Sequence, residues 1–249
     1  LRDLGSHQVA KDVFQEAVNH YRSLHTHQPD AFAGKLAMSL NNLGLSLRDL
    51  GDRQSAKEVA QEAVNHYRSL HTHNPDVFTA KLAMSLDNLG LSLRDLGDRQ
   101  SAKEVAQEAV NHYRSLHTHN SDVFTAKLAD SLNNLGVMLR DLGSHQVAKD
   151  VFQEAVNHYR SLHTHNPDVF TAKLAMSLDN LGLSLRDLGD RQSAKEVAQE
   201  AVNHYRSLHT HQPDAFASYL ASSLNNLGLV LSDLGDRQSA KEVAQEAVN

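Results

Sequence analysis

The chain has 249 residues and a net charge of −6, and 40% of its residues are apolar, which is enough to build a hydrophobic core. It contains no cysteine, so a disulfide framework, a zinc–thiolate site and a thiol nucleophile are all excluded. We see no basic run, no apolar run of about 18 residues and no signal peptide, so we expect a cytoplasmic protein that binds neither nucleic acid nor membrane.

The sequence repeats itself at a constant interval. The pentapeptide LRDLG begins at residues 1, 47, 93, 139 and 185, and LSDLG begins at 231, so every interval is 46 residues. A near-perfect period of this length indicates a solenoid, in which each repeat packs against its neighbours. We predict one repeat array over residues 1–249, with repeats at 31–76, 77–122, 123–168 and 169–214 and partial repeats at 1–30 and 215–249.

Each repeat is predicted to form two antiparallel helices, named helix A and helix B. In the repeat 31–76, helix A is expected from about Ala31 to Leu50, and helix B from about Arg53 to Leu70 or a little beyond. The connections are short, so successive helices must be antiparallel. The pattern predicts an all-α fold of about eleven helices, an α-solenoid of stacked helix pairs.

The ends of these helices carry recognisable signals. Gly51 is the expected stop of helix A and Asp52 is the expected N-cap of helix B. Asn74 is the expected N-cap of the next helix A, and a proline follows it at the first helical position. Serine replaces the capping aspartate at Ser6 and Ser144, where we expect it to cap equally well.

Both helices have one apolar side when residues are placed at about 100° per residue. Small residues lie within that side, and Gly44 on helix A costs roughly 1 kcal/mol of helix propensity relative to alanine. We expect close helix packing to offset that cost. The apolar side of helix A is formed by Leu36, Ala37, Leu40, Leu43, Gly44, Leu47 and Leu50, and that of helix B by Ala56, Val59, Ala60, Ala63, Val64, Tyr67 and Leu70.

These residues resemble the tetratricopeptide repeat pattern. The segment NNLG at 41–44 is followed by a leucine at 47 and by LGD at 50–52, and small residues recur on helix B. The ordinary tetratricopeptide unit has 34 residues, so this repeat of 46 belongs with a longer variety. The segment NPDVFTAKLAMSLDNLG at 74–90 is similar to the repeats of kinesin light chain and of NTPase-associated arrays. The resemblance implies a helical superhelix that binds a peptide or protein partner.

One face of helix A is the predicted partner-binding groove. In the tetratricopeptide fold this face lines the concave surface, and here it carries apolar residues among Asn and Arg. Asn side chains can satisfy a peptide backbone, and Arg can pair with carboxylates. The predicted groove residues are Met38, Asn41, Asn42, Leu45, Arg48, Met84, Asp87, Asn88, Leu91, Arg94, Asp130, Asn133, Asn134, Val137, Arg140, Met176, Asp179, Asn180, Leu183, Arg186, Asn225, Asn226 and Leu229.

Two interpretations of this face remain open. The Asn rows either bind a partner or only cross-link adjacent repeats, in which case the chain is a structural spacer or self-assembly segment of a larger signalling protein. The repeat 123–168 differs most from the others, with Asp130 in place of Met and Met138 in place of Ser, so we expect specificity to centre there. Because the array is cut within a repeat at both ends, we also expect end-to-end self-association.

The histidine-rich segment NHYRSLHTH recurs at 19–27, 65–73, 111–119, 157–165 and 203–211. On a helix, His66 and His71 fall on opposite shoulders of the apolar side, so they cannot share a metal ion within one helix. A site between repeats, or one using His71 and His73 in an extended segment, is the alternative. We predict no metal site and no cofactor. Ser, His and Asp recur in every repeat without a unique constellation, so no catalytic residues and no enzyme activity are expected.

Overall fold

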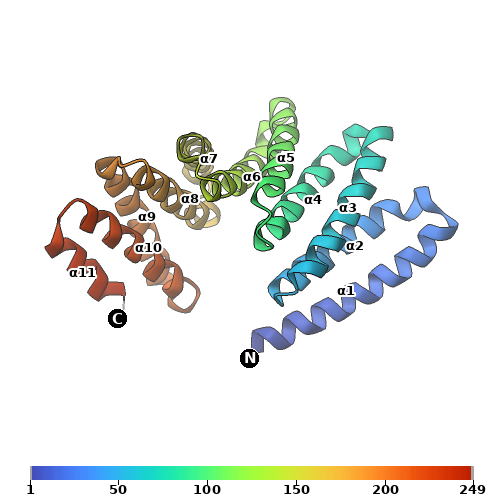
Figure 1. The fold of residues 1–249 in the computed structure, drawn as a ribbon, viewed down its shortest axis with the longest axis horizontal. Helices are drawn as coiled ribbons and strands as arrows, with labels where there is room; N and C mark the ends of the chain where they lie inside the picture. The colour runs from blue at the N-terminus through green and yellow to red at the C-terminus, as the bar shows by residue number, and fades with distance from the viewer. Residues whose placement is uncertain (1, 248–249) are drawn as a thin grey trace. The chain divides into compact units, whose positions relative to one another are not determined.

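The computed structural model describes residues 2–247 and shows eleven helices and no strand within them (Figure 1). The chain divides into two compact parts, Leu1–Phe124, named the N-terminal half, and Thr125–Asn249, named the C-terminal half. The helices of the N-terminal half are α1 (Arg2–His27), α2 (Pro29–Asp49), α3 (Arg53–His73), α4 (Pro75–Asp95) and α5 (Arg99–His119). Those that follow are α6 (Ser121–Asp141), α7 (His145–His165), α8 (Pro167–Asp187), α9 (Arg191–His211), α10 (Pro213–Asp233) and α11 (Arg237–Ala247).

Each half is a stack of helix pairs, as predicted. Even-numbered helices are helices A and odd-numbered helices are helices B. In the N-terminal half each helix packs against the next from α1 to α5, and α2 also touches α4. In the C-terminal half the same holds from α7 to α11, and α8 also touches α10. The all-α solenoid fold class is therefore confirmed.

The helix boundaries differ slightly from the predicted ones. The first complete helix A begins at Pro29 rather than near Ala31, because proline is tolerated in the first turn of a helix. Helix α3 continues to His73, three residues beyond Leu70. No glycine or proline interrupts the segment before Asn74, so nothing stops the helix earlier.

The predicted turn signals are confirmed at Gly51 and Asp52 but not at the two serines. Gly51 has a φ of +80°, and the Asp52 carboxylate accepts a hydrogen bond of 3.2 Å from the Ser55 amide. Ser6 is no cap, because α1 already begins at Arg2 and runs through it. Ser144 occupies the N-cap position but makes no capping hydrogen bond, since ψ is 54° there and its side chain is shorter than that of aspartate.

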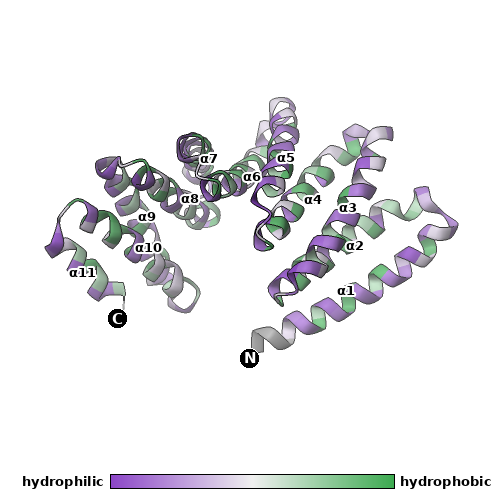
Figure 2. Cartoon of the chain, in the orientation of Figure 1, coloured by the Kyte–Doolittle hydropathy of each residue, from purple (hydrophilic) through white to green (hydrophobic). Residues whose placement is uncertain are grey.

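Close packing at the helix-A glycines is confirmed. A Cβ atom on Gly44 would lie 3.3 Å from Val59 Cγ2, and one on Gly136 would lie 2.6 Å from the Phe152 ring. Figure 2 shows hydrophobic and hydrophilic residues along the same helices, which is the distribution of an amphipathic helix. The buried side of helices A is built from leucines, and Tyr67 and Tyr159 are the largest fully buried side chains of helices B. This core leaves the opposite face of each helix A exposed.

Candidate functional site

The exposed face of helices A carries a row of apolar side chains. Met38 on α2 is 50% exposed and Leu45, seven residues later, is 39% exposed. Residues seven apart lie on one stripe of a helix, since two turns span about 7.2 residues. The row also includes the exposed Met84, Met176 and Leu229 and the half-buried Leu91, Val137 and Leu183.

This row extends one step further than the sequence analysis placed it. Val77 on α4 and Val169 on α8 lie seven residues before Met84 and Met176, and both are more than half exposed. The same seven-residue spacing predicts these positions from sequence, so the signal was present. The exposed face therefore begins in the first turn of each helix A.

The row that starts at Asn41 joins neighbouring helices A instead of facing solvent. Asn41 is buried, and its amide oxygen accepts a hydrogen bond of 2.9 Å from the Ser85 hydroxyl on α4. In the C-terminal half the Asn133 amide donates to Ser177 at 2.5 Å. The predicted groove role is therefore corrected for the buried members of this row, Asn41, Asp87 and Asn133. Asp179 is half-buried and Asn225 is exposed.

The Arg row is also used between repeats. Arg48 on α2 donates to the Asp95 carboxylate on α4 at 2.7 Å. In the C-terminal half the Arg140 and Asp187 side chains lie 3.5 Å apart, and Arg186 donates to an aspartate of α10. Partly exposed ion pairs of this kind contribute about 0–1 kcal/mol each. These pairs bear more on the predicted partner binding than on stability, because the guanidinium groups already bind carboxylates of the chain itself. The half-buried Asn42, Asn88, Asn134, Asn180 and Asn226 complete the polar part of the face.

Asp130 and Met138, two residues that distinguish the repeat 123–168, both contact other residues of the chain. Met138 is 1% exposed and belongs to the core, because the helix turns that position inwards. The Asp130 carboxylate accepts hydrogen bonds from the Tyr159 hydroxyl and from the Lys173 ammonium group, the latter at 2.8 Å to both oxygens. Specificity is therefore not centred on Met138, and the Asp130 carboxylate is shared by two neighbours.

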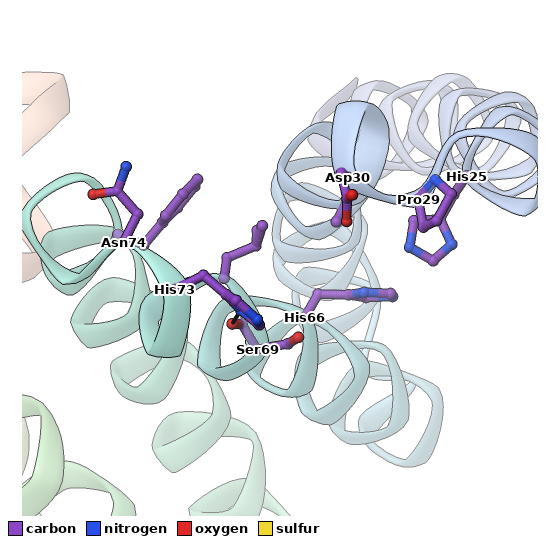
Figure 3. A pocket seen from close by; sticks show the side chains of 10 residues that line it. His25, Pro29, Asp30, His66, Ser69, His73 and Asn74 are labelled. Carbon is purple, nitrogen blue, oxygen red and sulfur yellow. Dashed lines mark hydrogen bonds between the residues drawn. The ribbon is translucent and has the colours of Figure 1, made fainter.

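Histidines from adjacent helices B line cavities in both halves of the chain. His25 on α1 and His66 on α3 have ring centroids 5.0 Å apart, and they line a cavity of about 430 Å³ together with His73. Figure 3 shows His66 reaching from α3 towards His25. A cavity of about 590 Å³ in the C-terminal half is lined in the same way by His163, His204 and His211. The sequence left a site between repeats open but did not identify these pairs, because each pair joins two different helices.

The surroundings of His66 and His204 favour the neutral imidazole. The pKa of His66 is lowered mainly by burial, then by the neighbouring His25, while Glu62 raises it and Arg22 lowers it further. Nδ1 of His73 lies 2.9 Å from the Ser69 carbonyl oxygen. Because a carbonyl oxygen can only accept, this nitrogen must be the hydrogen-bond donor. His71 and His73 both lie within α3, which rules out the extended arrangement for them. Among residues 2–247, no group of three or more His, Cys, Asp or Glu has a metal-binding arrangement.

Family models decide the relationship of the chain to known proteins. Tetratricopeptide repeat models match residues 81–161 and 127–207, and a second tetratricopeptide repeat model matches residues 36–76 and 220–249. The chain belongs to the tetratricopeptide repeat family. Repeats of this family typically act as non-catalytic scaffolds, and the predicted resemblance is confirmed.

Solved structures of other tetratricopeptide repeat proteins share this fold. BtubC (BKLC) from P. vanneervenii matches with a TM-score of 0.75 and 23% identity, covering 97% of this chain and 89% of that one. A putative kinesin light chain with nearly identical TPR-like repeats from Podosopora anserina matches with a TM-score of 0.66 and 17% identity, covering 86% and 93%. MamA from Desulfovibrio magneticus RS-1 matches with a TM-score of 0.55 and 17% identity, covering 85% and 93%. At these identities the likeness concerns the fold alone.

Two further results are negative. The search of curated proteins found no match to this tetratricopeptide repeat chain. None of the helices formed by residues 2–247 combines the length and the apolar character that crossing a membrane requires.

Proposed function

We propose that this tetratricopeptide repeat chain is a protein–protein interaction scaffold, and that the exposed face of its helices A binds an extended segment of a partner protein. The observation that carries the proposal is the apolar row, whose Met38, Leu45 and Met84 in the N-terminal half lie exposed on an otherwise polar face. Burying one such side chain contributes on the order of 1.5–3 kcal/mol. A contiguous exposed apolar row is typical of an interaction surface.

The polar residues of the face have a smaller role in this proposal than the sequence suggested. In the half-buried Asn42 row, Asn226 hydrogen-bonds Asp179, whereas Asn42, Asn88, Asn134 and Asn180 are left to hydrogen-bond a partner backbone, at about 0.5–1.5 kcal/mol per bond. Because Arg48 and Arg186 already pair with aspartates, we do not expect them to select an acidic partner. The partner is expected to be recognised mainly through its apolar side chains.

A second function is supported by the same inter-repeat contacts. The Ser85–Asn41 hydrogen bond and the Arg48–Asp95 ion pair both join neighbouring repeats. They favour a structural spacer within a larger protein, with no ligand on this face.

The experiment that separates the two functions uses random peptides displayed on phage and selected against the immobilised chain. Selected peptides are then synthesised, and their affinity is measured for the parent and for the triple variant Met38→Ser, Leu45→Ser, Met84→Ser. The variant should bind at least tenfold more weakly, since the three burials removed together exceed the roughly 1.4 kcal/mol that corresponds to tenfold.

The control is Val9→Ser, which removes an even more exposed apolar side chain from a helix B. Circular dichroism should show the same helix content for all three proteins, because exposed substitutions change stability by only about 0.5 kcal/mol. Enrichment of no peptide, or equal affinity for the triple variant, would support the spacer instead. The double variant Asn134→Ala with Arg140→Ala would be a weaker test of the same face, because Arg140 also pairs with Asp187.

A further inference from the structure

Two equivalent positions on the exposed face differ sharply between neighbouring repeats of the C-terminal half. The first repeat has Asp130 on α6 bonded to Lys173 on α8. Adding 46 to both numbers gives Met176 on α8 and Tyr219 on α10. An ion pair is thus replaced by two uncharged side chains. Tyr219 is the exception in the chain, because lysine occupies its position in the other repeats, at Lys35, Lys81, Lys127 and Lys173.

The exchange creates a cavity with aromatic walls. Met176, Tyr205, Phe216 and Tyr219 line a cavity of about 430 Å³, named the Tyr219 pocket, together with Lys173 and two alanines. The Tyr219 ring stacks on Tyr205 with centroids 5.9 Å apart and an interplanar angle of 18°, and it lies 6.0 Å from Phe216. Cavities that bind one small group are typically of this size and apolar.

The pocket is open to solvent because its position in the repeat faces solvent. Tyr219 is 53% exposed and Met176 is 40% exposed. The equivalent Lys35 on α2 is also exposed, although α4 packs beside α2 in the N-terminal half. This position therefore faces solvent even where another helix pair follows.

The residues that line the pocket carry no unpaired charge. Lys173 is the only charged residue in its lining, and its ammonium group holds both Asp130 oxygens at 2.8 Å. The same ammonium group lies 6.0 Å from the centroid of the Tyr159 ring. A charged side chain that entered the pocket would lose hydration without gaining an ionic partner. An uncharged apolar side chain meets no such penalty.

We propose that the Tyr219 pocket binds one uncharged apolar side chain of an extended partner segment. The inference rests on the proposed function and assigns one anchoring point to it. The occupant is a leucine-, methionine- or phenylalanine-like side chain, because the walls are aromatic and thioether groups and the one charged residue of the lining, Lys173, is paired with Asp130. The pocket gives the repeat 169–214 and the following helix a specificity that the other repeats lack.

The test uses a synthetic peptide obtained by the phage selection, with the parent chain and the variant Tyr219→Lys. Lysine is the residue of the equivalent positions, so this variant should fold like the parent. Its affinity for the peptide should be roughly tenfold weaker, as expected for loss of one buried apolar contact. The control variant Val147→Lys introduces the same charge at an exposed valine of α7 outside the pocket and should bind like the parent.

A second readout locates the peptide. The chain has four methionines, so ¹³C-methyl labelling gives four NMR signals, and Met176→Leu identifies that of Met176. Peptide addition should shift the Met176 signal most, and replacing the anchoring apolar residue of the peptide by glutamate should abolish the shift.

The outcomes separate this inference from the proposed function. Peptides that bind the parent and Tyr219→Lys equally, while shifting Met38 or Met84, would overturn the pocket and leave the scaffold function standing. A peptide whose anchoring residue in the pocket is charged would overturn the pocket assignment. If no peptide binds the parent chain, the pocket and the scaffold function both fail.

Discussion

The hydroxyl of Ser223 on α10 donates a hydrogen bond of 2.9 Å to the carboxylate of Asp179 on α8. The equivalent acceptor in the N-terminal half is the uncharged amide of Asn41. Burial of Asp179 raises its pKa to about 6, although hydrogen bonds from Ser223 and Asn226 oppose the shift. One inter-repeat position, buried at Asn41 and half-buried at Asp179, therefore holds either a neutral amide or a carboxyl group whose pKa is about 6.

We predict that Asp179→Asn stabilises the chain at neutral pH. The carboxyl group titrates near pH 3.9 when unfolded and near 6 when folded, so folding favours its protonated form. Its favourable contribution is complete below about pH 4 and is lost as the pH rises through about 6. The substitution should raise the free energy of unfolding by about 1–3 kcal/mol at pH near 7.5, measured by urea denaturation.

The same measurement at pH near 4 should show almost no gain, because the carboxyl group is then already neutral. The exposed Asp150→Asn on α7 is the control and should stay within about 0.5 kcal/mol of the parent at both pH values. A loss of stability at pH near 7.5 for Asp179→Asn would contradict the account.

The paired histidines are predicted to change stability with pH in the direction opposite to that of Asp179. Burial lowers the pKa of His66, His112 and His204, with the facing histidines of the preceding helices B as the second cause. Since folding lowers these pKa values, the contribution of these histidines to the free energy of unfolding is complete above a pH of about 6.5. It is lost as the pH falls below that value. The melting temperature should therefore fall between pH values of about 7.5 and 5.5.

The experiment is cleanest in the Asp179→Asn background, which removes the opposing carboxyl titration. Replacing His66, His112 and His204 together by glutamine should flatten the dependence, because Arg22 and His25 then face an uncharged side chain on α3. Full protonation of all 17 histidines would take the net charge from −6 to +11, adding general repulsion. An increase of several degrees in melting temperature on addition of micromolar zinc would instead indicate a metal site.

The glycines of helices A are predicted to tolerate alanine unequally. A Cβ atom on Gly136 would lie 2.6 Å from the Phe152 ring, whereas one on Gly182 would lie 3.3 Å from Val197 Cγ2. Gly136→Ala should destabilise by about 1–3 kcal/mol through overpacking. Gly182→Ala should be close to neutral, since the gain of about 1 kcal/mol in helix propensity offsets a milder contact. Thermal denaturation of both variants checks this.

A double variant isolates the cause. Other repeats carry alanine where this one has Phe152, as at Ala60 and Ala198. Adding Phe152→Ala to Gly136→Ala should therefore cost less than the sum of the two single changes, by more than about 0.5 kcal/mol. Strict additivity would show that the ring and the new methyl group do not collide.

The sequence predicted the fold and the exposed apolar row because both depend on features within one repeat. The 46-residue period, Gly51, Asp52 and the leucine pattern define the helix pair, and helical spacing alone places Met38 opposite the leucines. The buried state of Asn41 was not predictable in this way. Asn41 and Asn42 are neighbours about 100° apart on one helix, and only the crossing of α2 and α4 decides which of them is covered.

Contacts between repeats also explain the other differences. The His25–His66 contact joins residues 41 positions apart on two helices B, and the Arg48–Asp95 pair joins two helices A. No single-helix pattern contains either pair. The Tyr219 pocket is different, because a comparison of repeats shows tyrosine where lysine occurs elsewhere, and that exchange was visible in the sequence.

The last prediction concerns self-association of the 249-residue chain. Val13 on α1 is 58% exposed, whereas the equivalent Val59 on α3 is half-buried and lies against Gly44. The α1 surface is therefore of the kind that packs against a helix A elsewhere in the array, and we expect it to take a helix of a second molecule. Light scattering should show a mean mass that rises with concentration, and Val13→Glu should lower it. Val147→Glu, an exposed valine of α7, should leave it unchanged, and a strictly monomeric parent at high concentration would count against end-to-end association.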